Sequence, residues 1–231
     1  SGLFLTATAC APISSGPIID DGMAFEEARY QQLLVVEHHK EKLDQLMRVA
    51  HAIKKSNIDL CYDDNDVQHR ETGMYFDASE FLMLNDAPVG AVNYTNDVMA
   101  QPMVMYTVPT SPAAKILKAQ DLILAVDGTH LKEDSVKKNI IKANKLLNDA
   151  AKKGPSAPIL IERNGQQKQV DLGFDTVCPS HVYLSVSSKA DQDVNAYADG
   201  KNIYIRSSII SMANTDDRVA LVVGHELAHN A

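Results

Sequence analysis

The sequence predicts an α+β protein, and three of its stretches carry this prediction. Residues 25–55 have no Pro or Gly and place apolar side chains at helical spacing, which indicates one long amphipathic helix. Residues 87–172 alternate short apolar runs with turn dipeptides around a single helical stretch. Residues 177–231 combine a strand, a hairpin and an apolar helix.

The long helix carries His38, His39 and His51. Histidines on one face of a solvated helix are common, and we interpret these three as exposed residues rather than as metal ligands.

The middle region has the order of a small α+β domain. Strands are predicted at 104–108, 122–126, 159–162 and 169–172, with one helix at about 135–152. Asp127-Gly128 and Asn164-Gly165 are turn dipeptides typical of hairpins.

The last region begins with an alternating strand at 182–186. A hairpin is predicted at 196–205, turned by Asp199-Gly200. A helix then begins, capped by Asn214 or Thr215, with acidic residues in its first turn. Because residues 219–228 are almost wholly apolar, we expect this helix to be buried.

The net charge of −8 argues against nucleic acid as a partner, because phosphate binding requires clustered Lys and Arg. The three cysteines form no Cys-x-x-Cys pair, so a thiolate zinc site is not predicted.

The first residues suggest an exported protein. Small and apolar residues at 3–9 lead directly into Cys10, as in the tail of a bacterial lipoprotein signal peptide whose cysteine is lipidated. A short buried strand or the remnant of a fusion would also fit this segment. Residues 11–22 contain Pro12 and Pro17 and are interpreted as a tether.

The chemistry is predicted at the end of the chain, in His225-Glu226-Leu227-Ala228-His229. Two histidines four residues apart lie on one helix face, where both imidazoles can reach one tetrahedral Zn²⁺. Glu226, one position on, can accept a proton from a water acidified by the metal and pass it to the leaving amine. This is the zincin arrangement.

The setting of the motif makes it more specific. The residues between and before the ligands are uncharged, whereas a chance match on a surface helix would carry charges there. Polar residues within an apolar helix need partners, and a metal supplies them. The alternative interpretation is a hydrogen-bonded His/Glu cluster in the core.

Four stretches near the C-terminus share one family's pattern: 194–200 (Val-Asn-Ala-Tyr-Ala-Asp-Gly), 203–205 (Ile-Tyr-Ile), 216–217 (Asp-Asp) and 222–229. They resemble the HtpX-like gluzincin zinc metallopeptidases. The resemblance implies that His225 and His229 bind zinc, that Glu226 is the general base, and that Asn195, Ala196 and Tyr197 form the edge strand along the substrate. It also implies a third ligand, a Glu on a later helix, which lies beyond residue 231.

The middle region resembles a bacterial PDZ domain in three stretches: 111–114 (Ser-Pro-Ala-Ala), 117–128 (Leu-Lys-Ala-Gln-Asp-Leu-Ile-Leu-Ala-Val-Asp-Gly) and 162–165 (Glu-Arg-Asn-Gly). Ile116 and Gln120 stand where that pattern usually has glycine. An unrelated small α+β domain is the alternative. The order of helix, PDZ-like insert and zinc helix resembles the periplasmic, PDZ-containing lipoprotein branch of the family.

Four segments are therefore predicted. Residues 1–22 are a signal-peptide remnant and tether, 23–86 the long helix and a loop, 87–175 the PDZ-like domain, and 176–231 the start of a zincin-type metallopeptidase domain with a strand hairpin and a zinc-binding helix. The resemblance implies a periplasmic lipoprotein of a Gram-negative bacterium, anchored to a membrane through Cys10.

The first functional hypothesis is a zinc endopeptidase that acts on unfolded or misassembled envelope proteins, with peptide segments bound at the PDZ-like groove. The alternative is a non-catalytic PDZ-containing binding module or assembly chaperone. A purely structural lipoprotein leaves the zinc helix unexplained.

Cys61 follows the long helix and Cys178 follows the insert, so a disulfide between them would hold both ends of the insert. Two buried free thiols are the alternative. We also expect these 231 residues alone to bind zinc weakly, to lack peptidase activity, and to expose the apolar face of residues 219–228 with a frayed last turn.

Overall fold

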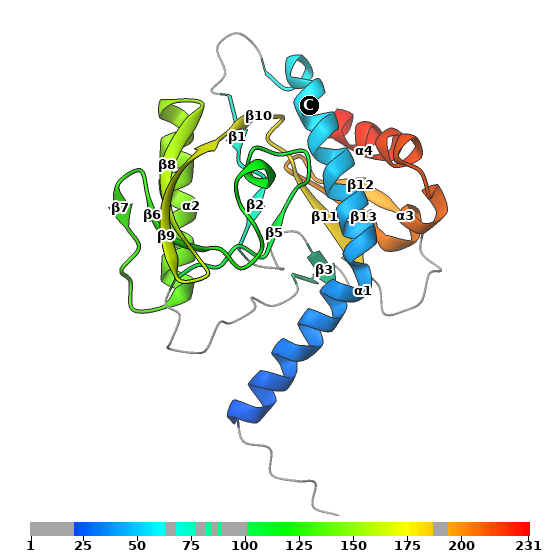
Figure 1. The fold of residues 1–231 in the computed structure, drawn as a ribbon. Coiled ribbons are helices and arrows are strands. Elements are labelled where there is room, and N and C mark those ends of the chain that lie inside the picture. The colour runs from blue at the N-terminus through cyan, green and yellow to red at the C-terminus, as the bar shows by residue number, and fades with distance from the viewer. Residues whose placement is uncertain (1–20, 63–67, 77–81, 85–86, 89–100, 187–193) are drawn as a thin grey trace, which may run out of the picture.

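The computed structural model describes residues 21–62, 68–76, 82–84, 87–88, 101–186 and 194–231. The predicted α+β class is confirmed (Figure 1). The helices are α1 (Asp21–Ser56), α2 (Val136–Lys153), α3 (Ser207–Ala213) and α4 (Asp216–Asn230), with 3₁₀ turns at Ile58–Leu60 and Ala113–Lys115. The strands are β1 (Arg70–Glu71), β2 (Met74–Tyr75), β3 (Leu82–Leu84), β4 (Ala87–Pro88), β5 (Tyr106–Thr107), β6 (Leu122–Val126), β7 (Thr129–His130), β8 (Ser156–Arg163), β9 (Gln166–Gly173), β10 (Asp175–Thr176), β11 (His181–Val186), β12 (Ala196–Ala198) and β13 (Asn202–Arg206).

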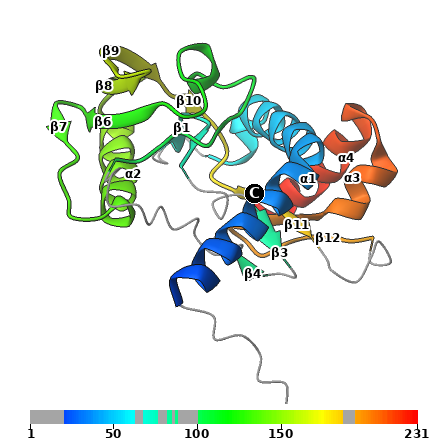
Figure 2. The same ribbon diagram turned by 60° about the horizontal axis from the view of Figure 1, so that its bottom comes forward.

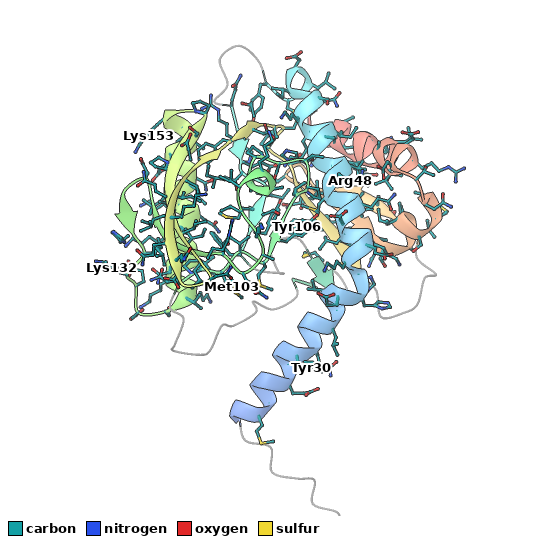
Figure 3. The ribbon with its side chains drawn as sticks, in the orientation of Figure 1. Tyr30, Arg48, Met103, Tyr106, Lys132 and Lys153 are labelled. Carbon is teal, nitrogen blue, oxygen red and sulfur yellow. A yellow bond between two sulfur atoms is a disulfide. The ribbon has the colours of Figure 1, made fainter. Side chains whose placement is uncertain are left out.

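Helix α1 is the predicted long helix, and its part from Val35 onward packs against the rest of the molecule (Figure 1). Its buried stripe includes Leu43, Leu46, Met47 and Ala50, which recur at helical spacing. The N-terminal half extends away from the body and carries Tyr30, which is 56% exposed (Figure 3). No helix in the described part of the chain combines the length and apolarity needed to cross a membrane.

Two of the histidines on α1 differ from the prediction. His51 is only 3% exposed and His39 only 9%, whereas His38 is exposed as expected. The prediction was wrong because the face of α1 that carries His51 is covered by carboxylates from residues that lie far along the chain.

The first core lies between α1, α3, α4 and a five-stranded sheet of order β12-β13-β11-β3-β4. The predicted strand forms β11, and the predicted hairpin forms β12 and β13. Strand β11 pairs in parallel with both β13 and β3, whereas β12 pairs antiparallel with β13. Alternate residues of β11 and β13 (Val182, Leu184, Ile203 and Ile205) point into this core.

Helix α4 lies on α1 and on the hairpin, so one side of it is covered. The helix continues to Asn230, and the fraying of its last turn stays a prediction. Leu221 is 75% exposed, as expected, but the expectation of an exposed apolar face is wrong for Val219, Val223 and Leu227, which are buried. The physical reason is that α1, which lies near the start of the sequence, forms the surface against which α4 packs.

The second core lies between α2 and a four-stranded sheet of order β7-β6-β8-β9 (Figure 2). Both predicted turn dipeptides form tight turns with left-handed backbone angles, φ 47° and 75° at Asp127-Gly128 and φ 53° and 74° at Asn164-Gly165. The hydroxyl of Ser135 accepts a hydrogen bond from the Lys138 N–H and caps α2.

Short ribbons join the two cores. Strand β1 pairs with β10, and β2 pairs with β5. The predicted Cys61–Cys178 disulfide is present, with a Cα–Cα distance of 5.5 Å. Met74 and Phe76 pack into the second core, although the sequence prediction assigned them to the segment before it. The domain boundaries otherwise stay predictions.

Candidate metal centre

Helix α4 brings His225 and His229 together on its exposed side. Their Nε2 atoms are 3.3 Å apart, and the two rings are nearly perpendicular, at 86°. Both side chains are exposed. The core-cluster interpretation does not fit these two residues, because neither imidazole lies in the core.

The spacing of the two nitrogens suits one tetrahedral metal ion. Two Zn–N bonds of about 2.05 Å at a tetrahedral angle place the nitrogens about 3.3 Å apart. Imidazole ligands suit Zn²⁺, as they also suit Cu, Fe and Ni. No set of three or more His, Cys, Asp or Glu is grouped to hold a metal among the residues that the structure describes. A catalytic metal site built on this pair would therefore need a third ligand.

Glu226 lies beside this pair but faces inward, and it is 7% exposed. A buried carboxylate next to two exposed imidazoles is held away from bulk water, on the same turn as the first ligand.

Strand β12 runs beside α4. Ala196 and Ala198 pack toward the first core, and their small side chains allow the helix to approach the strand. Tyr197 points to the opposite face, where its ring stacks on Tyr204, which in turn stacks on Tyr183. Because β12 is the terminal strand in the sheet order, one of its edges has no strand partner within the described residues. Asn195 is exposed at its start.

The N-terminal end of α4 is tied to α1. Asp216 accepts hydrogen bonds from both terminal nitrogens of Arg48 and from the Gln45 amide. The hydrogen bonds from Arg48 hold the pKa of Asp216 below its usual range. Figure 3 shows Arg48 on the part of α1 that α4 approaches.

The C-terminal end of α4 is tied to the β12–β13 turn. The side-chain oxygen of Asn230 accepts a hydrogen bond from the Gly200 N–H at 2.7 Å. Its amide nitrogen donates to Ser180 Oγ and to the Asn202 carbonyl, each at 3.2 Å. The helix that carries the histidines is thus held at both ends.

A cavity of about 390 Å³ lies between the two cores. Its walls are the segment 69–75, Asn144, Leu147 and Asn148 of α2, and His181 and Tyr183 of β11. Burial lowers the pKa of His69 and His181, and the nearby Lys54 ammonium acts in the same direction. Burial therefore favours the neutral form of both imidazoles.

The structure places the described site residues in two locations. The motif residues and the predicted substrate strand, 195–197, lie side by side on α4 and β12. The disulfide lies at the junction of the two cores, and Cys10 lies outside the described residues. Sequence reasoning missed Asn230 and the Arg48–Asp216 pair; the only signal was an Asn directly after the motif.

Residues 174–231 match the family model described as Peptidase family M48. A crystal structure of a PDZ domain protein from Parabacteroides distasonis is similar at 20% identity, with a TM-score of 0.32. This match covers 48% of the present chain and 21% of that protein, and so slight a likeness carries no argument. No curated protein matches the sequence.

Proposed function

We propose, from the membership of residues 174–231 in peptidase family M48, that this protein is a zinc-dependent endopeptidase. The observation that carries the proposal is the 3.3 Å approach of His225 Nε2 and His229 Nε2 on an exposed helix face. The proposed substrates are unfolded or misassembled envelope proteins, which present extended segments that can pair with an edge strand.

His225 and His229 would hold the zinc ion, with a carboxylate from a later helix as the third ligand, as the resemblance implies. When bound, Zn²⁺ lowers the pKa of water and polarises a carbonyl group. Glu226 would accept the proton that the attacking water loses and deliver it to the leaving amine.

Strand β12 would position the substrate. An extended peptide would add by main-chain hydrogen bonds to the edge of β12 that has no strand partner in the described part of the chain, and such bonds hold the backbone without regard to side-chain identity. Asn195, Ala196 and Tyr197 are the residues of this strand that we assign to substrate binding.

The second core would act as a PDZ-like peptide-binding insert. Its candidate groove is the cavity between segment 69–75 and α2, which has the volume to hold a short extended segment. Because His181 and Tyr183 of the first core also line it, a peptide in this groove would contact both cores. We further propose a periplasmic location in a Gram-negative bacterium and a lipid anchor at Cys10.

A non-catalytic role as a binding module or assembly chaperone is the alternative, and the cavity between the cores is the observation that favours it. This role would need the groove but neither Glu226 nor the metal.

The decisive experiment changes the motif one residue at a time in the intact protein. Glu226→Gln should abolish cleavage of casein, a fall of at least about 10³-fold, while elemental analysis finds one zinc per chain, because Glu226 carries protons and is not a ligand. His225→Ala and His229→Ala should lose both activity and metal. Arg218→Gln, an exposed change on the same helix, is the matched control. Full activity in Glu226→Gln would rule out this mechanism, and a chaperone assay unaffected by all three changes would favour the alternative.

A further inference from the structure

We propose that Asn230 is a positioning residue that sets the spacing between the metal-binding helix α4 and the substrate strand β12. This inference rests on the proposed function. Asn230 directly follows His229, and its side chain reaches the turn that ends β12. The Asn230 side chain thus links α4 directly to this hairpin.

The contact uses both halves of the Asn230 amide. The oxygen accepts from the Gly200 N–H, and the nitrogen donates to Ser180 Oγ and the Asn202 carbonyl. Only a side chain with an acceptor and two donors can make all three bonds. The amide therefore spans two segments, the β12–β13 turn and the residue that precedes β11.

The turn does not need Asn230 in order to fold. Asp199 accepts hydrogen bonds from the N–H groups of Lys201 and Asn202, at 2.9 and 2.7 Å, and from the Asn202 side chain at 2.8 Å. These bonds hold the pKa of Asp199 at about 2, so the carboxylate stays ionised and the turn stays intact at neutral pH. The turn is thus a fixed point to which the end of the helix is attached.

The body of α4 does not need Asn230 either. Val219, Val223 and Leu227 anchor the helix in the first core, and Asp216 anchors its first turn to α1. These anchors lie toward the N-terminal side of His229, whereas Asn230 is adjacent to it. Loss of the Asn230 amide should therefore leave the fold in place and release only the last turn, which carries one of the two histidines.

The consequence concerns geometry. The position of a peptide bound to β12 would be set by the strand, whereas the position of the metal would be set by α4. A displacement of about 1 Å between the reacting groups can reduce the rate by about 10²-fold. Asn230 would set the distance between the bound peptide and the metal, and it would do so without contacting either of them.

The test compares Asn230→Ala, Ser180→Ala and the double variant of the intact protein, with Arg218→Gln as the exposed control on α4. In Asn230→Ala we expect kcat for a fluorogenic peptide to fall by about 10- to 100-fold while KM changes less than about 2-fold. Ser180→Ala should give a smaller loss, and the two losses should not add, because both remove the same hydrogen bond.

Two further measurements do not depend on activity. Hydrogen exchange of the metal-free protein should show amides of the last turn of α4 and of Gly200 exchanging at least about 10-fold faster in Asn230→Ala, with β13 unchanged. Co²⁺ should still bind one ion per chain, but with a changed visible absorption spectrum.

Unchanged exchange and unchanged kcat in Asn230→Ala would overturn the inference. So would a loss of kcat that follows a matching loss of metal, because Asn230 would then serve only to keep the helix end folded. If the wild-type protein cleaves nothing, the proposed function fails, and the exchange and Co²⁺ measurements still decide whether Asn230 positions the helix.

Discussion

Gly73 shows how a single residue position constrains this fold. Its φ is +71°, and a Cβ built there would lie 2.3 Å from the Cβ of Ser111. Two separate restrictions therefore apply to Gly73, the left-handed backbone and the closeness of a buried side chain. The contact joins segment 69–75, one wall of the candidate groove, to the loop that leads into the second core.

Gly73→Ala should lower the free energy of unfolding by about 2–4 kcal/mol, because the backbone strain and the overlap with Ser111 add. The matched control is Gly165→Ala, which has nearly the same φ of +74° but no atom within 4 Å of the added Cβ. In the control, the free energy of unfolding should fall by only about 1 kcal/mol. Urea denaturation of both variants measures the difference, and equal losses would show that the contact with Ser111 relaxes freely.

Gln120 is the opposite case. The PDZ resemblance leads one to expect glycine at this position, and Gln120 indeed has a left-handed φ of +73°. Its N–H donates to the Val104 carbonyl at 2.8 Å, so the turn forms despite a backbone cost of about 1–2 kcal/mol. The missing glycine changes the local energy of the turn but not its path.

Charged side chains attach the β1–β10 ribbon to helix α1. His51 of α1 faces Glu71 through Nδ1 at 3.1 Å and Asp175 through Nε2 at 2.9 Å. Lys54 bonds Glu71 at 2.9 Å and Lys55 bonds Asp175 at 2.6 Å, so the ribbon is attached to α1 by paired charges.

This cluster predicts how stability depends on pH. Burial raises the pKa of Glu71, but Lys54 and His51 outweigh it and bring the pKa down to about 2, from an ordinary value of 4.5. Because the folded pKa is the lower one, the stabilisation is complete above pH 4.5 and is lost as pH falls toward 2. The loss should be on the order of 3 kcal/mol.

Denaturant titrations at pH 7, 4.5 and 3 test this prediction. Glu71→Gln should be less stable at pH 7, because Lys54 loses its partner, and should depend less on pH below 4.5. At each pH, the free energy of unfolding of the variant is subtracted from that of the wild type. The difference isolates the contribution of Glu71 from that of other carboxylates, such as Asp199. Parallel pH curves for the two proteins would contradict the assignment.

At the scale of the whole molecule, one covalent bond closes the chain around the second core. Cys61 and Cys178 are 117 residues apart in sequence, and the enclosed segment contains α2 and its four-stranded sheet. Tyr106 adds a second link, since its hydroxyl donates to Asp44 of α1 at 3.1 Å (Figure 3). The two cores are therefore joined at more than one point.

Replacing both Cys61 and Cys178 with Ser should lower the free energy of unfolding by about 4 kcal/mol in the chain-entropy view, because a long loop is released in the unfolded state. Guanidinium denaturation measures the change, and a reductant should destabilise the wild type but have no further effect on the variant. Cys10→Ser is the control and should leave the reductant effect intact. Equal stability of the variant and the wild type would show that the ribbons alone hold the cores together.

The sequence alone was enough to predict the elements that depend on neighbouring residues. Helix α1 and helix α4 followed from apolar spacing, and the turns at Asp127 and Asn164 followed from the need for left-handed angles. The spacing of His225 and His229 required only one turn of helix. In each case the deciding interactions lie within a few positions along the chain.

Tertiary structure decided the rest. His51 meets Asp175, 124 residues away, and Asn230 meets Gly200, 30 residues away, and neither pairing leaves a local pattern. The two-residue strands β1 and β10 are too short to show periodicity, so only their pairing defines them. Which face of α4 is buried depended on α1 from the opposite end of the sequence. The sequence therefore determined which residues could hold a metal. The tertiary contacts decided how rigidly these residues are held and where they lie relative to β12. They did so because they join segments that are far apart in the sequence, which a local pattern does not encode.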